Sequence, residues 1–380
     1  MSETPYDPEA RRDTPLALKL RERIRRDGPI AVADYMRACL TDPEHGYYVA
    51  RQAVGAKGDF VTAPEISQIF GELIGLWSAV VWQQMGAPAR FNLVELGPGR
   101  GTMMRDALRA ARIVPGFLDA ASLHLIESNA TLTQLQREAI LPLAANACWH
   151  CDFASASEGD AAIPEGPTIL LANEFLDCIP PVQSVKSRDG WRLRGVGLDA
   201  GGQLCFDVQT GSARRDDLDT RFPDAASGSV VEQAQCQFLA EWTARCASRA
   251  PTAGLFIDYG GMSDGLHDTL QAVRAHSFEH PLTAPGEADL TAQVNFADWQ
   301  RAFETAGLGV DGPVTQAQFL GTLGIVERAS RLMNANPRLA HLIETGVARL
   351  IAVPGMGDRF KAIAVRSSGL PPPPGFESKP

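Results

Sequence analysis

The feature that most constrains this chain is a glycine-rich turn that directly follows a short apolar segment. Residues 91–101 read FNLVELGPGRG, and a helical pattern continues from Thr102 to about Ile113. A buried strand, a glycine loop and a helix in this order form the first unit of a nucleotide-binding α/β fold. Glycine permits positive φ and lets backbone N–H groups approach a ligand with no Cβ in the way. The alternative is a strand-to-helix turn whose glycines serve packing alone. The E-x-G-x-G-x-G spacing is not the G-x-G-x-x-G of dinucleotide-binding dehydrogenases.

Apolar segments then alternate with helical patterns, which is typical of parallel strands covered on both faces. We expect further strands at residues 122–127, 147–153, 168–175, 254–260 and 360–366. Residues 182–209 instead alternate apolar and polar side chains, which predicts antiparallel strands. A loop at 211–228 and a helix at 230–249 are expected to follow.

The sequence therefore predicts one α/β unit over residues 1–370. Its parts are a helical N-terminal lobe (1–88), a Rossmann-like core (89–182 and 250–370) and an antiparallel β insertion (183–229). The tail at 371–380 is rich in proline and is expected to be disordered.

Composition and charge exclude several classes of function. The net charge of −10 argues against a nucleic-acid partner, which would need a basic face. Runs of apolar residues are too short to predict membrane insertion. The N-terminus is polar and acidic, unlike a secretory signal or a mitochondrial transit peptide. Seven scattered cysteines favour a reducing compartment, so the sequence predicts a cytoplasmic protein. Cys148 and Cys151 lack a second pair of ligands, so no metal site is expected.

Candidate residues for a bound nucleoside stand where the predicted strands end, because ligands of open α/β sheets bind there. Glu127 could accept the ribose hydroxyls, and Asp152 with Phe153 could bind and stack an adenine. A solvated carboxylate and an ordinary loop are the respective alternatives. The full set of expected cofactor-binding residues is Glu95, Gly97, Pro98, Gly99, Gly101, Glu127, Asp152, Phe153 and Asn173.

Acidic residues follow the fourth predicted strand in the segment NEFLDCIP. Glu174 and Asp177 could hold a guanidinium group, which pairs with carboxylates in a bidentate fashion. Capping of a helix N-terminus is the alternative. Asp59, Glu65 and Asp258 are the further catalytic candidates.

Several longer segments together resemble the MidA-like family: GDFVTAPEISQIFGELIG, ELGPGRGTMMRDALR, NEFLDCIP, IDYGG and PGEADLTAQVNF. The resemblance implies a class I methyltransferase fold whose seven-stranded sheet has an antiparallel last strand. It also implies S-adenosyl-L-methionine at Gly97, Pro98, Gly99 and Gly101, with Glu127 and Asp152 on the nucleoside. Mitochondrial members of that family are arginine methyltransferases that assist assembly of respiratory complex I.

The resemblance thus implies a protein arginine methyltransferase whose substrate is a complex I (NADH dehydrogenase) subunit. Methylation of a small molecule or of another protein nucleophile is one alternative. The other is a complex I assembly chaperone that keeps the fold without turnover.

Overall fold

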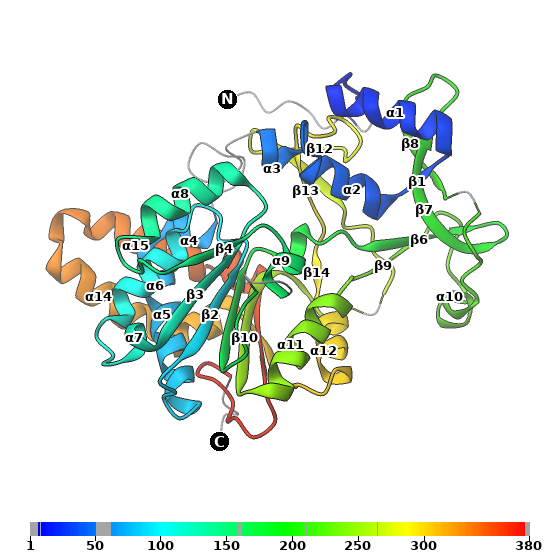
Figure 1. Cartoon of the computed structure of the whole chain (residues 1–380). Helices are drawn as coiled ribbons and strands as arrows, with labels where there is room; N and C mark the ends of the chain where they lie inside the picture. The colour runs from blue at the N-terminus through cyan, green and yellow to red at the C-terminus, as the bar shows by residue number, and fades with distance from the viewer. Residues whose placement is uncertain are drawn as a thin grey trace.

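The computed structural model describes residues 7, 9–50, 62–157, 162–209, 211–263 and 265–376, and Figure 1 shows its architecture. A central sheet organises the chain. Its strands lie in the order β15 (Gly309–Thr315), β16 (Phe360–Arg366), β10 (Thr252–Gly261), β5 (Thr168–Asn173), β2 (Phe91–Leu96), β3 (Ala121–Ile126) and β4 (Cys148–His150), and β14 (Val294–Asn295) pairs with the end of β10.

Five strands of this sheet, from β10 to β4, run parallel, whereas β16 is antiparallel to both of its neighbours. The α/β fold with an antiparallel final strand is therefore confirmed. The chain passes from β2 outward to β3 and β4 and then returns to β5 on the other side of β2. That reversal opens a crevice at the carboxyl ends of β2 and β5, where open α/β sheets bind their ligands.

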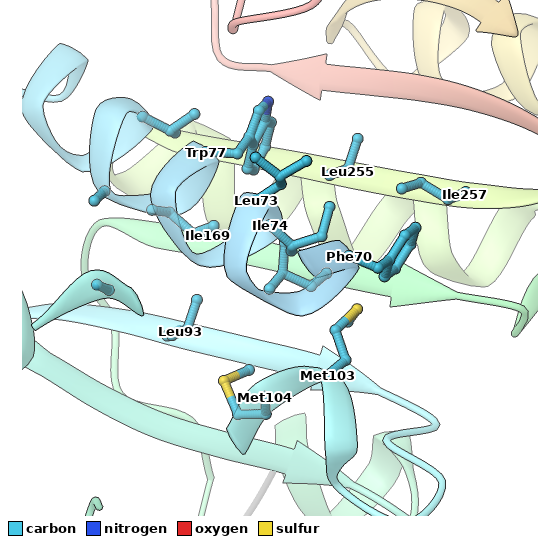
Figure 2. Close-up of a cluster of buried hydrophobic side chains, with 14 of the residues drawn as sticks. Phe70, Leu73, Ile74, Trp77, Leu93, Met103, Met104, Ile169, Leu255 and Ile257 are labelled. Atoms are coloured by element: carbon cyan, nitrogen blue, oxygen red, sulfur yellow. The ribbon is translucent and has the colours of Figure 1, made fainter. Parts of the chain in front are cut away.

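Helices cover both faces of the sheet, which explains the continuous apolar strands. Leu93 joins the core beneath α5 (Gln68–Gln84) and α6 (Thr102–Ala111). The next residue, Val94, joins the opposite core beneath α11 (Gln237–Arg249) and α12 (Phe296–Thr305). Figure 2 shows the first core, in which Phe70 and Trp77 of α5 lie over the strands together with Met103 of α6.

The other helices add to these two cores. The first also receives side chains of α7 (Phe117–Ala120), α8 (Ala130–Ile140), α13 (Gln316–Thr322), α14 (Ile325–Ala335) and α15 (Ala340–Ile351). The second receives side chains of α9 (Phe153–Ser157) and of the 3₁₀ turn η1 (Leu176–Cys178). The turn η2 (Pro337–Leu339) leads into α15, and α16 (Met356–Arg359) leads into β16.

A second lobe joins the N-terminal segments to the insertion. Helices α1 (Pro15–Asp27) and α2 (Val32–Thr41) share a buried cluster with residues of the insertion. Strand β1 (Ile30–Ala31) pairs with β7 (Gly190–Leu198), which also pairs with β6 (Val182–Ser187) and β8 (Leu204–Val208). The short helices α3 (Tyr47–Ala50) and α4 (Ala63–Ile66) lead from this lobe toward α5.

Three regions of this lobe differ from the expectations based on the sequence. Residues 230–233 form strand β9 (Val230–Gln233), paired with β6, instead of the first turn of a helix. The loop expected at 211–228 contains α10 (Asp216–Arg221). A three-stranded sheet of β11 (Gln271–Arg274), β12 (Ser277–Glu279) and β13 (Asp289–Thr291) was not foreseen. Strand β9 pairs with β6 and β13 pairs with β11, both distant in sequence, and periodicity alone does not reveal such pairing.

The disorder expected for the proline-rich tail is wrong for residues 371–376. Trp77 Nε1 donates a hydrogen bond to the carbonyl oxygen of Pro374 at 3.1 Å. Phe376 is buried against Phe319, with their ring centroids 5.3 Å apart. Burial of one aromatic side chain offsets the entropy of ordering several residues that proline has already restricted. Residues 377–380 lie outside the described part of the chain.

Residues 337–359 are apolar enough to be compared with a membrane span, and only 11% of their most apolar window is buried. They do not form one continuous helix, because α15 ends at Ile351 and α16 begins at Met356. The expected absence of membrane insertion stays a prediction.

Two glycines allow α5 and α6 to pack at close range. A Cβ added at Gly71 would lie 2.8 Å from the carbonyl oxygen of Met103, and one at Gly75 would lie 2.3 Å from that of Ala107. Both contacts are with backbone atoms that cannot move aside without shifting α6. Since α6 begins at the glycine loop, this close packing also fixes the loop.

We expect Gly75→Ala to lower the free energy of unfolding by about 1–3 kcal/mol, because the added methyl group overpacks the α5–α6 contact. Urea unfolding followed by circular dichroism measures the change. Gly321→Ala is the matched control, since a Cβ at Gly321 meets nothing within 4 Å. Equal effects of the two substitutions would contradict the assignment.

Candidate active site

The loop that follows β2 has the positive φ values that its glycines led us to expect. Gly97, Gly99 and Gly101 have φ values of +59°, +56° and +77°. A Cβ at Gly97 would lie 2.8 Å from Cδ2 of Phe175, so the ring of Phe175 occupies the space that the glycine leaves. Gly101 is the N-cap of α6, which places the positive end of that helix dipole at the loop.

A cavity lies beside this loop, between Glu95, Pro98, Asn173 and Glu174. Glu95 is only 2% exposed, and its Oε2 accepts no hydrogen bond from any residue that the structure describes. The Oδ1 atom of Asn173 is likewise buried without a partner among the described residues. Burial, with a contribution from Glu127, raises the pKa of Glu95 to about 8. Buried polar atoms are normally hydrogen-bonded, so two such acceptors fit a ligand that brings a cationic N–H donor group.

Glu127 lies at the next strand end and is tied to the glycine loop. Its Oε1 accepts a hydrogen bond from the Asn129 backbone N at 2.8 Å, and its Oε2 accepts one from Gln136 Nε2 at 3.1 Å. Gln136 Nε2 also donates to the carbonyl oxygen of Gly99 at 2.7 Å. Burial raises the pKa of Glu127 to about 7. A carboxylate has about four acceptor sites, so Glu127 can still accept ribose hydroxyls.

Asp152 and Phe153, the residues expected to bind adenine, differ in their surroundings. Asp152 is exposed, and its Oδ1 accepts a hydrogen bond from the Ser155 backbone N at 2.7 Å. These contacts with Ser155 lower the pKa of Asp152, which here stabilises the start of α9. The Phe153 ring packs against Phe238 and Trp242, with centroids 5.2 and 6.0 Å away. Phe175, which the sequence analysis did not select, lies between Phe153 and Gly97.

Glu174 stands at the carboxyl end of β5 with a φ of +51°, a conformation that non-glycine residues seldom adopt. Its Oε1 accepts hydrogen bonds from the Ala63 backbone N at 2.8 Å and from Asn173 Nδ2 at 3.2 Å. Burial raises the pKa of Glu174 to about 7. The N-terminal lobe thus contributes a hydrogen bond that holds this side chain against the crevice.

Asp177 and Asp258 lie together beyond Glu174. Asp258 is fully buried and accepts hydrogen bonds from the backbone N atoms of Leu176, Asp177 and Tyr259 at 2.8, 3.2 and 2.8 Å. Burial, and then the neighbouring charge of Asp177, raises the pKa of Asp258 well above its usual range. Burial and the charge of Asp289 raise the pKa of Asp177 to about 8. The two donors that belong to η1, the backbone N atoms of Leu176 and Asp177, identify Asp258 as the residue that fixes this turn.

Two further residues, Asp289 and Tyr48, lie at this group of carboxyl groups and were not among the candidates predicted from the sequence. Asp289, on β13, accepts a hydrogen bond from the Tyr48 hydroxyl at 3.0 Å. The same hydroxyl lies 2.9 Å from Cys178 Sγ, and Cys178 Sγ donates to Asp177 Oδ1 at 3.3 Å. Asp289 lies in the segment PGEADLTAQVNF, which carried the family resemblance, but nothing in the spacing of Tyr48 and Asp289 indicated that they would meet η1.

The two remaining catalytic candidates come from the segment before α5. Asp59 lies outside the described residues. Glu65, on α4, borders the cavity beside the glycine loop and accepts a hydrogen bond from the Thr102 hydroxyl. This contact joins the N-terminal lobe to the first turn of α6, so the geometry assigns Glu65 to closing the cavity.

The fold and this crevice define a class I methyltransferase: a parallel sheet, a glycine loop at the switch point and carboxylates at successive strand ends. The comparisons with known proteins agree. Residues 73–314 match a family of S-adenosyl-L-methionine-dependent methyltransferases, and the chain belongs to that family. The resemblance to the MidA-like family and the S-adenosyl-L-methionine cofactor are thereby confirmed.

Two curated relatives carry more specific names. The chain is 36% identical over 377 residues to the protein arginine methyltransferase NDUFAF7 homolog of Drosophila melanogaster, covering 92% of this chain and 84% of that protein. It is 34% identical over 389 residues to the human protein arginine methyltransferase NDUFAF7, with coverages of 93% and 83%. A crystal structure of a COG1565 superfamily member from Burkholderia thailandensis, bound to S-adenosyl-homocysteine, is similar with a TM-score of 0.80 at 28% identity, covering 95% of this chain and 94% of that one.

One sequence-based expectation fails in this comparison. Both curated relatives are named mitochondrial proteins, which contradicts the predicted cytoplasmic location. The scattered cysteines argue only against an oxidising compartment, and a reducing interior is not particular to the cytoplasm.

We expect affinity for S-adenosyl-homocysteine to increase as the pH rises from about 6 to about 8. With a pKa of about 8, Glu95 is mostly protonated at neutral pH, whereas a ligand ammonium group is stabilised by the ionised form. Glu95→Gln should weaken binding by about tenfold or more and reduce the pH dependence, since a hydrogen bond to a charged group is lost. Titration calorimetry at several pH values measures both quantities. Glu304→Gln, at an exposed position of α12, is the control. An unchanged slope in Glu95→Gln would contradict the role of this carboxylate.

Proposed function

We propose that this protein transfers a methyl group from S-adenosyl-L-methionine to an arginine side chain of a protein. The observation that carries the proposal is the group formed by Glu174, Asp177 and Asp258 next to the donor cavity. Among the described residues, no lysine or arginine forms an ion pair with these three carboxyl groups. The nearby Arg349 lowers the pKa of Glu174 only as a minor contribution. The names of the curated relatives support the same acceptor.

The chemistry of the acceptor explains why buried acids suit this reaction. When bound, S-adenosyl-L-methionine supplies an electrophilic methyl group. A guanidinium ion has no free nitrogen lone pair for attack and does not lose its proton in water. Carboxylates can orient its planar fork and receive the proton as the new bond forms. With a pKa of about 8, Asp177 is a stronger base near neutral pH than an ordinary aspartate.

The donor side of the proposal uses the residues already placed in the crevice. Glu95 and Asn173 would hold the ammonium end of the donor, Glu127 would accept hydrogen bonds from its ribose, and Gly97 with Gly99 would let it approach the backbone closely. Phe153 and Asp152 border the expected adenine position. Glu174 stands between the donor cavity and Asp177, so it can contact the acceptor nitrogen beside the methyl group.

The proposed protein substrate is a subunit of respiratory complex I, as the MidA-like resemblance implies. We expect radiolabelled methyl groups to pass from S-adenosyl-L-methionine to one arginine of a purified complex I subunit, located by mass spectrometry. Label on lysine or on a metabolite would refute the arginine assignment and favour another nucleophile. Absence of transfer together with absence of donor binding would favour a non-catalytic assembly chaperone.

We expect Asp177→Asn to reduce the rate of methyl transfer by about 100-fold or more, the usual contribution of a positioned general base. The fold should persist, because asparagine keeps the shape of a buried carboxyl group whose ionised form is already disfavoured by burial and by Asp289. Single-turnover kinetics measure the rate, and calorimetry with S-adenosyl-homocysteine should show unchanged donor affinity. Asp216→Asn, whose side chain is 81% exposed, is the matched control. Full activity in Asp177→Asn would move the proton-accepting role to Glu174.

A further inference from the structure

A second cavity lies at the junction between the insertion and the core, away from the donor loop. It is bordered by Glu232 of β9, Gly261 of β10, Asn295 of β14 and Trp299 of α12. Figure 1 shows β9 approaching β14 and α12 at this junction. None of these residues belongs to the expected donor site or to the acidic group around η1.

One continuous segment connects the two cavities. Asn173 and Glu174 border the donor cavity, whereas Leu176, Ile179 and Pro181 border the second one. A polypeptide acceptor whose reacting nitrogen lies at Glu174 can therefore extend along this segment and place a neighbouring side chain in the second cavity. Leu176 and Trp299 supply an apolar floor suited to the methylene groups of a long side chain.

Glu232 gives this cavity its charge. Its Oε1 accepts hydrogen bonds from Gln183 Nε2 at 2.7 Å and from the Thr269 backbone N at 3.0 Å, and its Oε2 accepts one from the Thr269 hydroxyl at 2.6 Å. Burial raises the pKa of Glu232, and the hydrogen bonds from Thr269 and Gln183 offset part of that shift by stabilising the ionised form. No lysine or arginine among the described residues pairs with Glu232. Arg194, the arginine of this network, pairs with Asp268 at 2.8 Å and donates to Gln183.

The mouth of the cavity has properties of a surface that binds a polypeptide. Met262 and Leu266 are 55% and 40% exposed, beside the cavity residues Ser263 and His267. The exposed side chain of Gln293 adds an amide that can pair with peptide N–H and C=O groups. Exposed apolar side chains around a charged pocket are typical of protein-binding sites.

We propose that this cavity binds a second basic side chain of the protein acceptor, a few residues away from the methylated arginine, through Glu232. The proposal rests on the proposed function, because it names the substrate feature that the insertion recognises. Glu232 is a specificity-determining residue in this role, and it takes no part in the transfer itself. The chemistry that it selects is an arginine or lysine with an extended flanking backbone.

The test uses fluorescein-labelled glycine peptides that contain two arginines separated by one to four residues. In each matched peptide, citrulline replaces the second arginine, which removes the charge and keeps the shape. Fluorescence anisotropy with the full chain and saturating S-adenosyl-homocysteine measures affinity. We expect at least one two-arginine peptide to bind about tenfold more tightly than its citrulline partner, the size of a hydrogen-bonded charge pair.

Two substitutions should abolish that advantage. Glu232→Gln removes the charge, and Gly261→Phe fills the cavity, where a Cβ at Gly261 meets nothing within 4 Å. Both variants should keep wild-type affinity for S-adenosyl-homocysteine and a wild-type melting temperature. Glu241→Gln, which removes an exposed carboxylate of α11, should keep the advantage.

Equal binding of all matched peptides by the wild type, or an advantage that survives both substitutions, would overturn the proposal. Its failure differs from failure of the proposed function. If the protein prefers two-arginine peptides through Glu232 but transfers no methyl group, the binding site at Glu232 stands and the proposed methyltransferase function fails. If it transfers methyl groups without regard to the second arginine, the proposed function stands and the site at Glu232 fails.

Discussion

Several carboxyl groups are buried close together at one edge of the parallel sheet, and the free-energy cost of ionising them there constrains the rest of the structure. Parallel strands end on the same side, so polar residues at their ends become neighbours. Burial raises the pKa of Glu95, Glu127, Glu174, Asp177 and Asp258, so their charged forms are costly at this edge. Hydrogen bonds from Asn129 and Gln136 to Glu127, and from the backbone to Asp258, offset part of that cost. The ammonium group of the donor and the guanidinium of the proposed acceptor are both cations, and either would stabilise an ionised carboxylate here.

The N-terminal lobe makes that arrangement rigid, although it precedes the glycine loop in sequence. The Ala63 backbone holds Glu174, Glu65 binds Thr102, and Tyr48 joins Asp289 to the neighbourhood of Asp177. Asn129, which caps α8, donates to the carbonyl oxygen of Tyr48 and through its backbone N to Glu127. The donor side and the acceptor side of the crevice therefore share one residue of the lobe. Such shared contacts keep buried polar groups in a single arrangement, because each broken bond would expose another group to an apolar environment.

The sequence predicted those parts of the structure that depend on local pattern. The buried strands were recognisable because helices cover both faces, and the glycine loop because its backbone requires positive φ. The residues that depend on distant contacts were not recognisable: Asp289 meets η1 through the pairing of β11 with β13, and Phe376 packs on Phe319. A proline-rich composition indicates which backbone conformations the tail can adopt. It does not indicate whether the one aromatic residue of the tail packs into the core. Asp152 shows that one position can suit two roles, since a strand-end carboxylate that could bind a nucleoside also caps the next helix.

In our proposal the core carries out methyl transfer and the second lobe selects the substrate. This assignment rests on the point at which β9 of that lobe meets the core. Strand β9 brings Glu232 to the far end of the segment whose near end borders the donor cavity. In our proposal, Glu174 at one end of this segment and Glu232 of β9 beside its other end bind two basic side chains of one polypeptide. The net charge of −10 attracts basic chains at longer range, and this attraction weakens as the salt concentration increases. Attraction at long range is indifferent to sequence, so the proposal assigns discrimination between basic proteins to the fit of a second side chain beside Glu232.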